Sequence, residues 1–193
     1  MRVLVVAAPR SGTRAFAALL RGMGLDTGHE RLGPDACVSS YFAVYADRYH
    51  GPHERRQERR GNVVADQVWH LVRHPLDAIG SIASRMSPRW WRWQEPHTGV
   101  SPELSEPERA ARFWVRWMEK IEADPAVSWR IRIEDANDLR EEIARRLRAD
   151  RIGDAVSTDI GDTRGAKRAE LFHVELTTAA QIEKRAAEYG YTL

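Results

Sequence analysis

The start of the chain constrains its fold more than any other segment. Residues 3–6 form a short apolar run rich in valine, which is typical of a buried strand, and Pro9 marks its end. Beyond Thr13 the apolar residues recur at helical spacing, and Gly24 stands where that helix would end. A strand, a tight loop and a helix in this order are typical of the first unit of a parallel α/β fold.

The loop between this strand and helix combines hydroxyl groups with fixed positive charge. Its residues are Arg10, Ser11, Gly12, Thr13 and Arg14. The N–H groups of a helix's first turn have no partner within the helix, and the helix dipole attracts anions to the same end. The loop has one glycine and no lysine, so it is not a Walker A phosphate loop. It predicts a cradle for phosphate or sulfate; an ordinary strand-to-helix turn capped by Ser11 or Thr13 is the alternative.

The composition is that of a globular protein. Of the 193 residues, 42% are hydrophobic and 30% are charged, which predicts a single domain spanning residues 1–193. The net charge of +2 argues against a broad nucleic-acid surface. The lone Cys37 excludes an internal disulfide and is typical of a small buried hydrophobic side chain. No apolar segment is long enough to span a membrane, and Arg10 interrupts the first run too early for a signal peptide. We therefore expect a cytoplasmic protein with no membrane or nucleic-acid partner.

Strands and helices alternate along the rest of the chain. A second strand at residues 68–72 leads into a helix with Pro75 at its first position, and an amphipathic helix is expected at 108–123. A strand at 127–133 ends in Glu134 and Asp135, and a capping box at 176–181 opens a last helix. This alternation predicts a parallel α/β sheet with ligand at the carboxyl ends of its strands.

Two segments lack a clear pattern. Residues 26–47 carry no helix or strand period. Residues 87–107 are rich in proline and tryptophan, which predicts a long loop or short helical turns. Such a loop could be a lid over a binding site, or its tryptophans could fill an edge of the core; the sequence leaves both interpretations open.

Four segments, taken in order, resemble the motifs of the sulfotransferases that use 3′-phosphoadenosine 5′-phosphosulfate (PAPS). Residues 9–13 resemble the 5′-phosphosulfate loop of that family. Arg73 at a strand end, with Ser81 eight residues later, is similar to its 3′-phosphate motif. Residues 131–135 resemble the family's strand that ends in an acidic pair, and residues 162–168 its late basic loop.

The resemblance implies a three-layer, P-loop-like α/β fold, with a central parallel sheet flanked by helices. It implies transfer of a sulfuryl group from PAPS to a hydroxyl or amine acceptor, with 3′,5′-ADP as product. No metal is expected, because sulfate carries less charge than a γ-phosphate. The residues that would bind the donor are Arg10, Ser11, Gly12, Thr13, Arg14, Arg73, Ser81, Arg164, Gly165 and Lys167.

The acceptor hydroxyl also needs a general base. Several branches of the family use a glutamate shortly after the first helix, and others use a histidine. Glu30 stands at the glutamate's place and is the first candidate, with the adjacent His29 second; Arg10 is expected to assist catalysis by stabilising charge. The alternative for Glu30 is a surface ion pair, for example with Arg31.

Two other functions remain compatible with these motifs. One is a small nucleotide or metabolite kinase with a degenerate phosphate loop, although the lysine of that loop is missing. The other is a nucleotide-binding protein that has lost catalysis. The sequence indicates a small-molecule or glycan acceptor without identifying it, and it does not define an oligomeric state.

Overall fold

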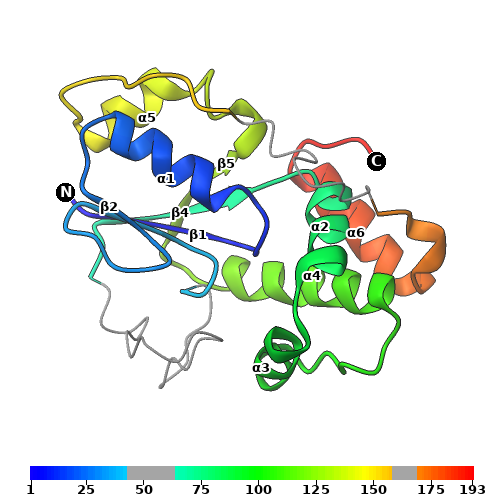
Figure 1. Cartoon of the computed structure of the whole chain (residues 1–193). Coiled ribbons are helices and arrows are strands. Elements are labelled where there is room, and N and C mark those ends of the chain that lie inside the picture. The colour runs from blue at the N-terminus through cyan, green and yellow to red at the C-terminus, as the bar shows by residue number, and fades with distance from the viewer. Residues whose placement is uncertain (43–63, 158–168) are drawn as a thin grey trace.

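The computed structural model describes residues 1–42, 64–157 and 169–193 and is built on a parallel sheet (Figure 1). The strand order is β2-β3-β1-β4-β5, and every pairing is parallel. The carboxyl ends of all five strands therefore meet at one edge, with β1 in the centre. The strands are β1 (Val3–Ala7), β2 (Thr27–His29), β3 (Ala36–Ser39), β4 (Gln67–Val72) and β5 (Val127–Arg132).

Helices cover both faces of the sheet (Figure 1), which confirms the predicted α/β fold with a central parallel sheet flanked by helices. Val3 and Val5 face one core, while Leu4 and Val6 face the other. Because β1 is buried on both sides, its sequence is an unbroken apolar run instead of an alternating one. The first core lies under α1 (Thr13–Gly22) and α5 (Arg140–Leu147); the second lies under α2 (Pro75–Arg85), α3 (Pro88–Thr98), α4 (Glu106–Glu122) and α6 (Leu176–Glu188).

Residues 26–47, whose sequence shows no clear pattern, contain the two strands β2 and β3. A strand of three or four residues is too short to show a period. The turn between them depends on close backbone contacts, since a Cβ added to Gly28 would lie 2.0 Å from the carbonyl oxygen of Arg31. A Cβ on Gly33 would lie 2.4 Å from the Gly28 nitrogen. Backbone packing, and not a side-chain pattern, defines this part of the sheet.

The tryptophan-rich segment is helical over α3, so the expected loop or short turns are wrong for residues 88–98. The Ser87 side chain caps the helix by accepting a hydrogen bond from the Trp90 amide at 3.2 Å, and Pro88 occupies the first turn. Trp90 and Trp91 are buried and pack edge-on against Phe113 of α4. These two tryptophans belong to the core.

The last helix begins at Leu176, but the predicted capping box does not form. Glu175 is the N-cap residue, without a side-chain cap. Thr178 lies inside the helix, where its hydroxyl donates to the Glu108 carboxylate of α4 at 3.4 Å. The contact with α4 thus takes the hydroxyl that a capping box would use.

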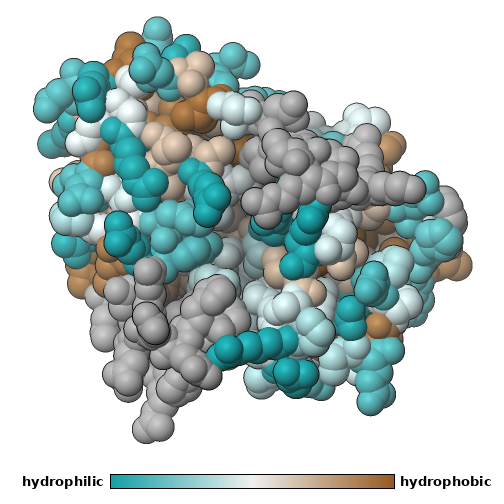
Figure 2. All heavy atoms as spheres, in the orientation of Figure 1, coloured by the Kyte–Doolittle hydropathy of each residue, from teal (hydrophilic) through white to brown (hydrophobic). Residues whose placement is uncertain are grey.

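The surface that faces the viewer in Figure 2 is largely hydrophilic over the described residues, with hydrophobic side chains in smaller groups between. No helix within these residues combines the length and apolar character needed to cross a membrane.

His70 is a polar side chain in the middle of the core. It lies on β4 with no exposed surface, and neither ring nitrogen has a hydrogen-bond partner among the described residues. Its ring meets Tyr189 edge-on, with 5.9 Å between the ring centres. Burial, and then the positive charge of Arg130, lowers the pKa of His70 to about 3. The folded protein therefore holds this ring neutral.

Acid is expected to destabilise the protein through His70. The unfolded chain binds a proton there below about pH 6.5, whereas the folded chain does so only near pH 3. As the pH falls through this window, His70 lowers the free energy of unfolding by about 1.4 kcal/mol per pH unit. The substitution His70→Leu removes this group without breaking a hydrogen bond of the ring among the described residues. In denaturant titrations, the free energy of unfolding of this variant should change with pH by about 1.4 kcal/mol per unit less than that of the wild type. Equal slopes in His70→Leu and wild type would contradict the assignment.

Candidate functional site

The loop after β1 places its polar groups at the carboxyl edge of the sheet. The Ser11 amide donates to the Ala8 carbonyl at 3.3 Å, and Gly12 precedes the helix with a left-handed φ of 83°. Arg10 also has a left-handed φ, 71°, which is uncommon for a residue with a side chain. This turn brings the chain straight into α1, whose first-turn amides face the loop.

The Ser11 hydroxyl stands out at this edge because no group of the described residues hydrogen-bonds to it. The Ser11 side chain has no exposed surface, and its Oγ has no hydrogen-bond partner among the described residues. Buried hydroxyls are normally hydrogen-bonded, so an orphan hydroxyl beside a helix N-terminus fits a site that an anion completes. The other loop hydroxyl, on Thr13, lies 3.0 Å from the His29 ring nitrogen Nε2.

The second predicted anion motif meets the first. Arg73 and Ser81 are both buried, at 7% and 4% exposure. The Arg73 guanidinium donates to the Arg10 carbonyl at 3.1 Å, and the Arg10 guanidinium donates to the Ser81 hydroxyl at 2.9 Å. Residues more than 60 positions apart in the chain thus form one cluster at the ends of β1 and β4.

The acidic pair after β5, Glu134 and Asp135, forms hydrogen bonds next to this cluster. The Glu134 carboxylate accepts hydrogen bonds from the His74 amide at 3.0 Å and from the Tyr191 hydroxyl at 2.6 Å. Burial and the Glu134 carboxylate raise the pKa of Tyr191, which keeps it protonated as a donor. The neighbouring Asp135 accepts from Arg132 at 2.6 Å. Glu134 therefore ties the C-terminal residues to the turn that carries Arg73.

The two candidate bases lie at the end of β2, near the loop after β1. Glu30 has a left-handed φ of 53°. Its carboxylate accepts from the hydroxyls of Ser39 and Ser40 at 2.7 and 2.8 Å, and from the Ser40 amide at 3.1 Å. Among the described residues it forms no ion pair with Arg31. Ser39 and Ser40 were not predicted, because the four-residue strand β3 is too short to show a period.

His29 is the base candidate in contact with the loop. Burial lowers the pKa of His29; the Glu30 carboxylate, 3.9 Å away, opposes this, and the charges of Arg14 and Arg21 lower it further. The ring is therefore neutral near pH 7 and can accept a proton. Arg14 is exposed at the start of α1, and its positive charge is one of those that lower the pKa of His29.

The late basic loop lies outside the described residues, so the structure does not place Arg164, Gly165 or Lys167. Directly after it, the Ala169 amide donates to the Leu76 carbonyl in the first turn of α2 at 3.0 Å. Across the described ranges, no three His, Cys, Asp or Glu side chains gather as a metal site would require.

A comparison with solved structures finds a similar fold. A solved structure, titled a sulfotransferase domain from the curacin biosynthetic pathway, superposes with a TM-score of 0.55 at 12% sequence identity. The alignment covers 100% of this chain and 98% of that domain. This chain has a sulfotransferase-like fold. No protein-family model matches the sequence, and no curated protein matches it significantly.

Ser11→Ala should separate stability from anion binding. Because the Ser11 hydroxyl has no partner within the described structure, its removal should change the melting temperature little. Binding of inorganic sulfate should weaken about fivefold or more, since a hydrogen bond to an anion is lost.

Ser39→Ala is the matched control. Ser39 is as buried as Ser11, but its hydroxyl donates to Glu30 at 2.7 Å and accepts from the Tyr41 amide at 3.0 Å. This variant should lose about 1–3 kcal/mol of stability. Unchanged sulfate affinity in Ser11→Ala would remove Ser11 from the anion site.

Proposed function

We propose that residues 1–193 act as one sulfotransferase domain, which transfers a sulfuryl group from PAPS to a hydroxyl or amine acceptor. The observation that carries the proposal is the hydrogen bond from Arg10 to Ser81. This bond joins the loop after β1 to the Arg73–Ser81 motif, and the donor has one anionic group for each. Both motifs lie at the carboxyl edge of the sheet, where folds of this kind bind ligands. The sulfotransferase-like fold over the whole chain supports the same assignment.

In this proposal each motif takes one end of the donor. Ser11, Gly12, Thr13 and the first-turn amides of α1 bind the 5′-phosphosulfate, with Arg10 and Arg14 supplying positive charge. Arg73 and Ser81 bind the 3′-phosphate, which distinguishes PAPS from ATP. The late loop, with Arg164, Gly165 and Lys167, would complete the donor site. An enzyme that keeps full activity in EDTA would agree with transfer that requires no metal.

The reaction would be an in-line displacement at sulfur. The acceptor oxygen forms a bond to sulfur as the bond from sulfur to the 5′-phosphate oxygen breaks, and the acceptor proton passes to the base. Negative charge then grows on the leaving phosphate. Arg10 and the hydroxyls of Ser11 and Thr13 are the groups proposed to stabilise that charge.

The surroundings of the two base candidates favour His29, with Glu30 as its positioning residue. Both oxygens of the Glu30 carboxylate already accept hydrogen bonds, from the hydroxyls of Ser39 and Ser40, which fix its position. His29 needs only to exchange its contact with Thr13 for the acceptor hydroxyl. We therefore propose His29 as the proton acceptor. Sequence position alone favours Glu30 over His29, so we reverse our first choice.

Nucleotide binding tests the donor site. We expect 3′,5′-ADP to raise the melting temperature more than 5′-AMP or ATP, because only 3′,5′-ADP has a phosphate for Arg73 and Ser81. In Arg73→Gln, affinity for 3′,5′-ADP should fall about ten- to hundredfold and approach that for 5′-AMP, as measured by calorimetry. Arg145→Gln, at an exposed arginine of α5, is the control. Equal affinities for 3′,5′-ADP and 5′-AMP in the wild type would refute the second anion site.

Two outcomes would select the other candidate functions. Preference for ATP over 3′,5′-ADP would point to a kinase. Tight binding of 3′,5′-ADP, with no transfer from labelled PAPS to a panel of phenols, alcohols, amines and sugars, would point to a binding protein without catalysis.

The pH profile distinguishes the two bases. If neutral His29 takes the proton, kcat/KM falls in acid as His29 becomes protonated, at a pKa below its usual value. Glu30→Gln removes the charge that raises this pKa, so the acid limb should move to lower pH. His29→Asn should abolish the limb and lower kcat about 10²–10⁴-fold. A loss of that size in Glu30→Gln, with His29→Asn near wild type, would assign the base to Glu30.

A further inference from the structure

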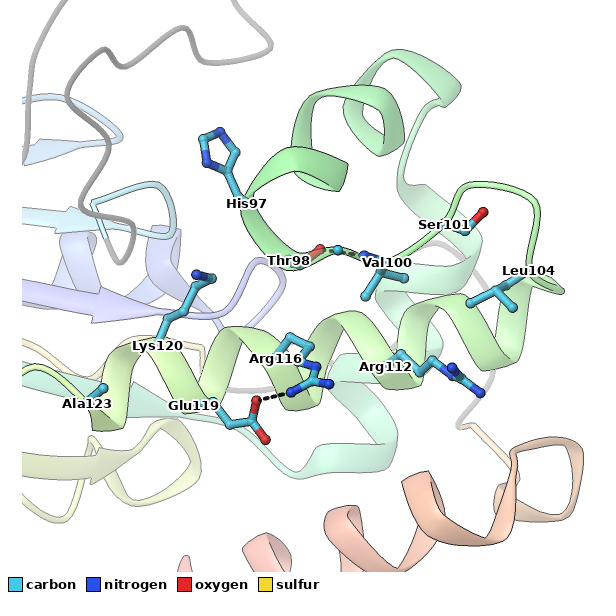
Figure 3. A pocket seen from close by; sticks show the side chains of 11 residues that line it. His97, Thr98, Val100, Ser101, Leu104, Arg112, Arg116, Glu119, Lys120 and Ala123 are labelled. Carbon is cyan, nitrogen blue, oxygen red and sulfur yellow. Dashed lines mark hydrogen bonds and ion pairs between the residues drawn. The ribbon is translucent and has the colours of Figure 1, made fainter.

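A second concave site lies between the end of α3 and the outer face of α4 (Figure 3). Its volume is about 570 Å³. The opposite face of α4 carries Trp117, whose ring N–H donates to the Ala7 carbonyl of β1 at 3.2 Å. The helix therefore stands between this pocket and the sheet.

Three cations line the α4 side of the pocket. Arg112, Arg116 and Lys120 follow one another at four-residue spacing, about 6 Å of helix rise per step. Arg112 forms ion pairs with two carboxylates, and Arg116 pairs with Glu119 at 3.0 Å. Lys120 has no ion pair within the described structure. The Arg116–Glu119 pair is mostly exposed and contributes little, so Arg116 can turn to a ligand at low cost.

The opposite wall is fixed before any ligand arrives. Gln94 is fully buried, and its side-chain amide donates to the Val100 carbonyl at 3.1 Å. The Thr98 hydroxyl donates to the Gln94 carbonyl at 3.2 Å, and Gly99 ends α3 with a left-handed φ of 68°. This network fixes the conformation of the chain where α3 ends, and these residues form one wall of the pocket.

The two ends of the pocket differ in chemistry. Figure 3 shows His97 and Lys120 at one end, Ser101 and Leu104 at the other, and Arg116 between them. The first end carries the ammonium group of Lys120. The second end offers the Leu104 side chain and the Ser101 hydroxyl, which accepts a hydrogen bond from the Glu103 amide at 3.2 Å.

We propose that this pocket binds the phosphate or sulfate monoester of a small organic molecule. Lys120 and Arg116 hold the anionic group, while the apolar body lies along Leu104. A tetrahedral anion suits this pair, because a lysine acts as a point charge and an arginine fork can reach a second oxygen. The site is independent of the proposed function, since it shares no residue with the donor site.

His97 reports directly on this pocket. Its ring is half-buried and lies against Trp93, with 4.9 Å between ring centres. Burial lowers the pKa of His97, and the charge of Lys120 lowers it further. An anion that neutralises Lys120 should therefore raise this pKa.

The test follows the His97 ring resonances by NMR, assigned by their loss in His97→Asn, while phenyl phosphate or phenyl sulfate is added. Saturable movement and a raised His97 pKa are expected with both esters, and no movement with phenol. The response should persist in Ser11→Ala, which weakens the donor loop alone. If phenol shifts the His97 resonances as much as the esters do, the pocket binds the apolar ring and not the anionic group.

Charge variants complete the test. Lys120→Gln should weaken ester binding about tenfold or more and raise the pKa of His97 even without ligand. Lys120→Arg should retain binding, and circular dichroism checks that each variant is folded. Lys184→Gln removes the same charge from the exposed surface of α6 and should bind like the wild type. Unmoved His97 resonances, or equal weakening in Lys120→Gln and Lys184→Gln, would overturn the proposal.

Discussion

The parallel pairing of β1 with β3 and β4 is the constraint on which the candidate site depends. Val6 of β1 lies opposite Ser39 on one side and His70 on the other. The loops after these three strands consequently begin at the same level of the sheet. Arg10 and Arg73 meet because each follows its strand by a few residues, and the Glu30 carboxylate reaches Ser39 at the same edge. Sheet register, and not closeness in sequence, assembles the cluster.

This register explains what the sequence could predict. Residues 3–6 and 68–72 are apolar runs long enough to recognise, and the polar residues after them belong at the carboxyl edge once the strands are taken as parallel. That Arg10 and Ser81 lie side by side follows from this logic. Ser39, Ser40 and the final placement of His29 could not be predicted, because β2 and β3 are too short to show a period and their turn depends on Gly28. The helix α3 was missed although Ser87 and Pro88 form a usable start signal, since its many tryptophans obscure the helical period.

The helix α4 shows how one amphipathic segment can serve two sites. Its apolar face was evident in the sequence, and through Trp117 that face supports the end of β1. Its outer face carries Arg116 and Lys120, which a sequence pattern would assign only to solvent. They line a pocket together with the residues after α3, whose conformation the buried Gln94 fixes. A local contact at the end of α3 thus completes the wall that faces these two cations.

Backbone conformation adds an independent argument for the edge of the sheet. Within the described ranges three residues other than glycine have a left-handed φ, and two of them, Arg10 and Glu30, lie in the candidate site. Such a conformation costs about 1–2 kcal/mol and persists only where surrounding contacts hold it. The side chain of Arg10 is held by Ser81, and that of Glu30 by Ser39 and Ser40. One strained residue thus lies in the loop after β1 and the other at the end of β2 beside it, a cost that an ordinary strand-to-helix turn would not require.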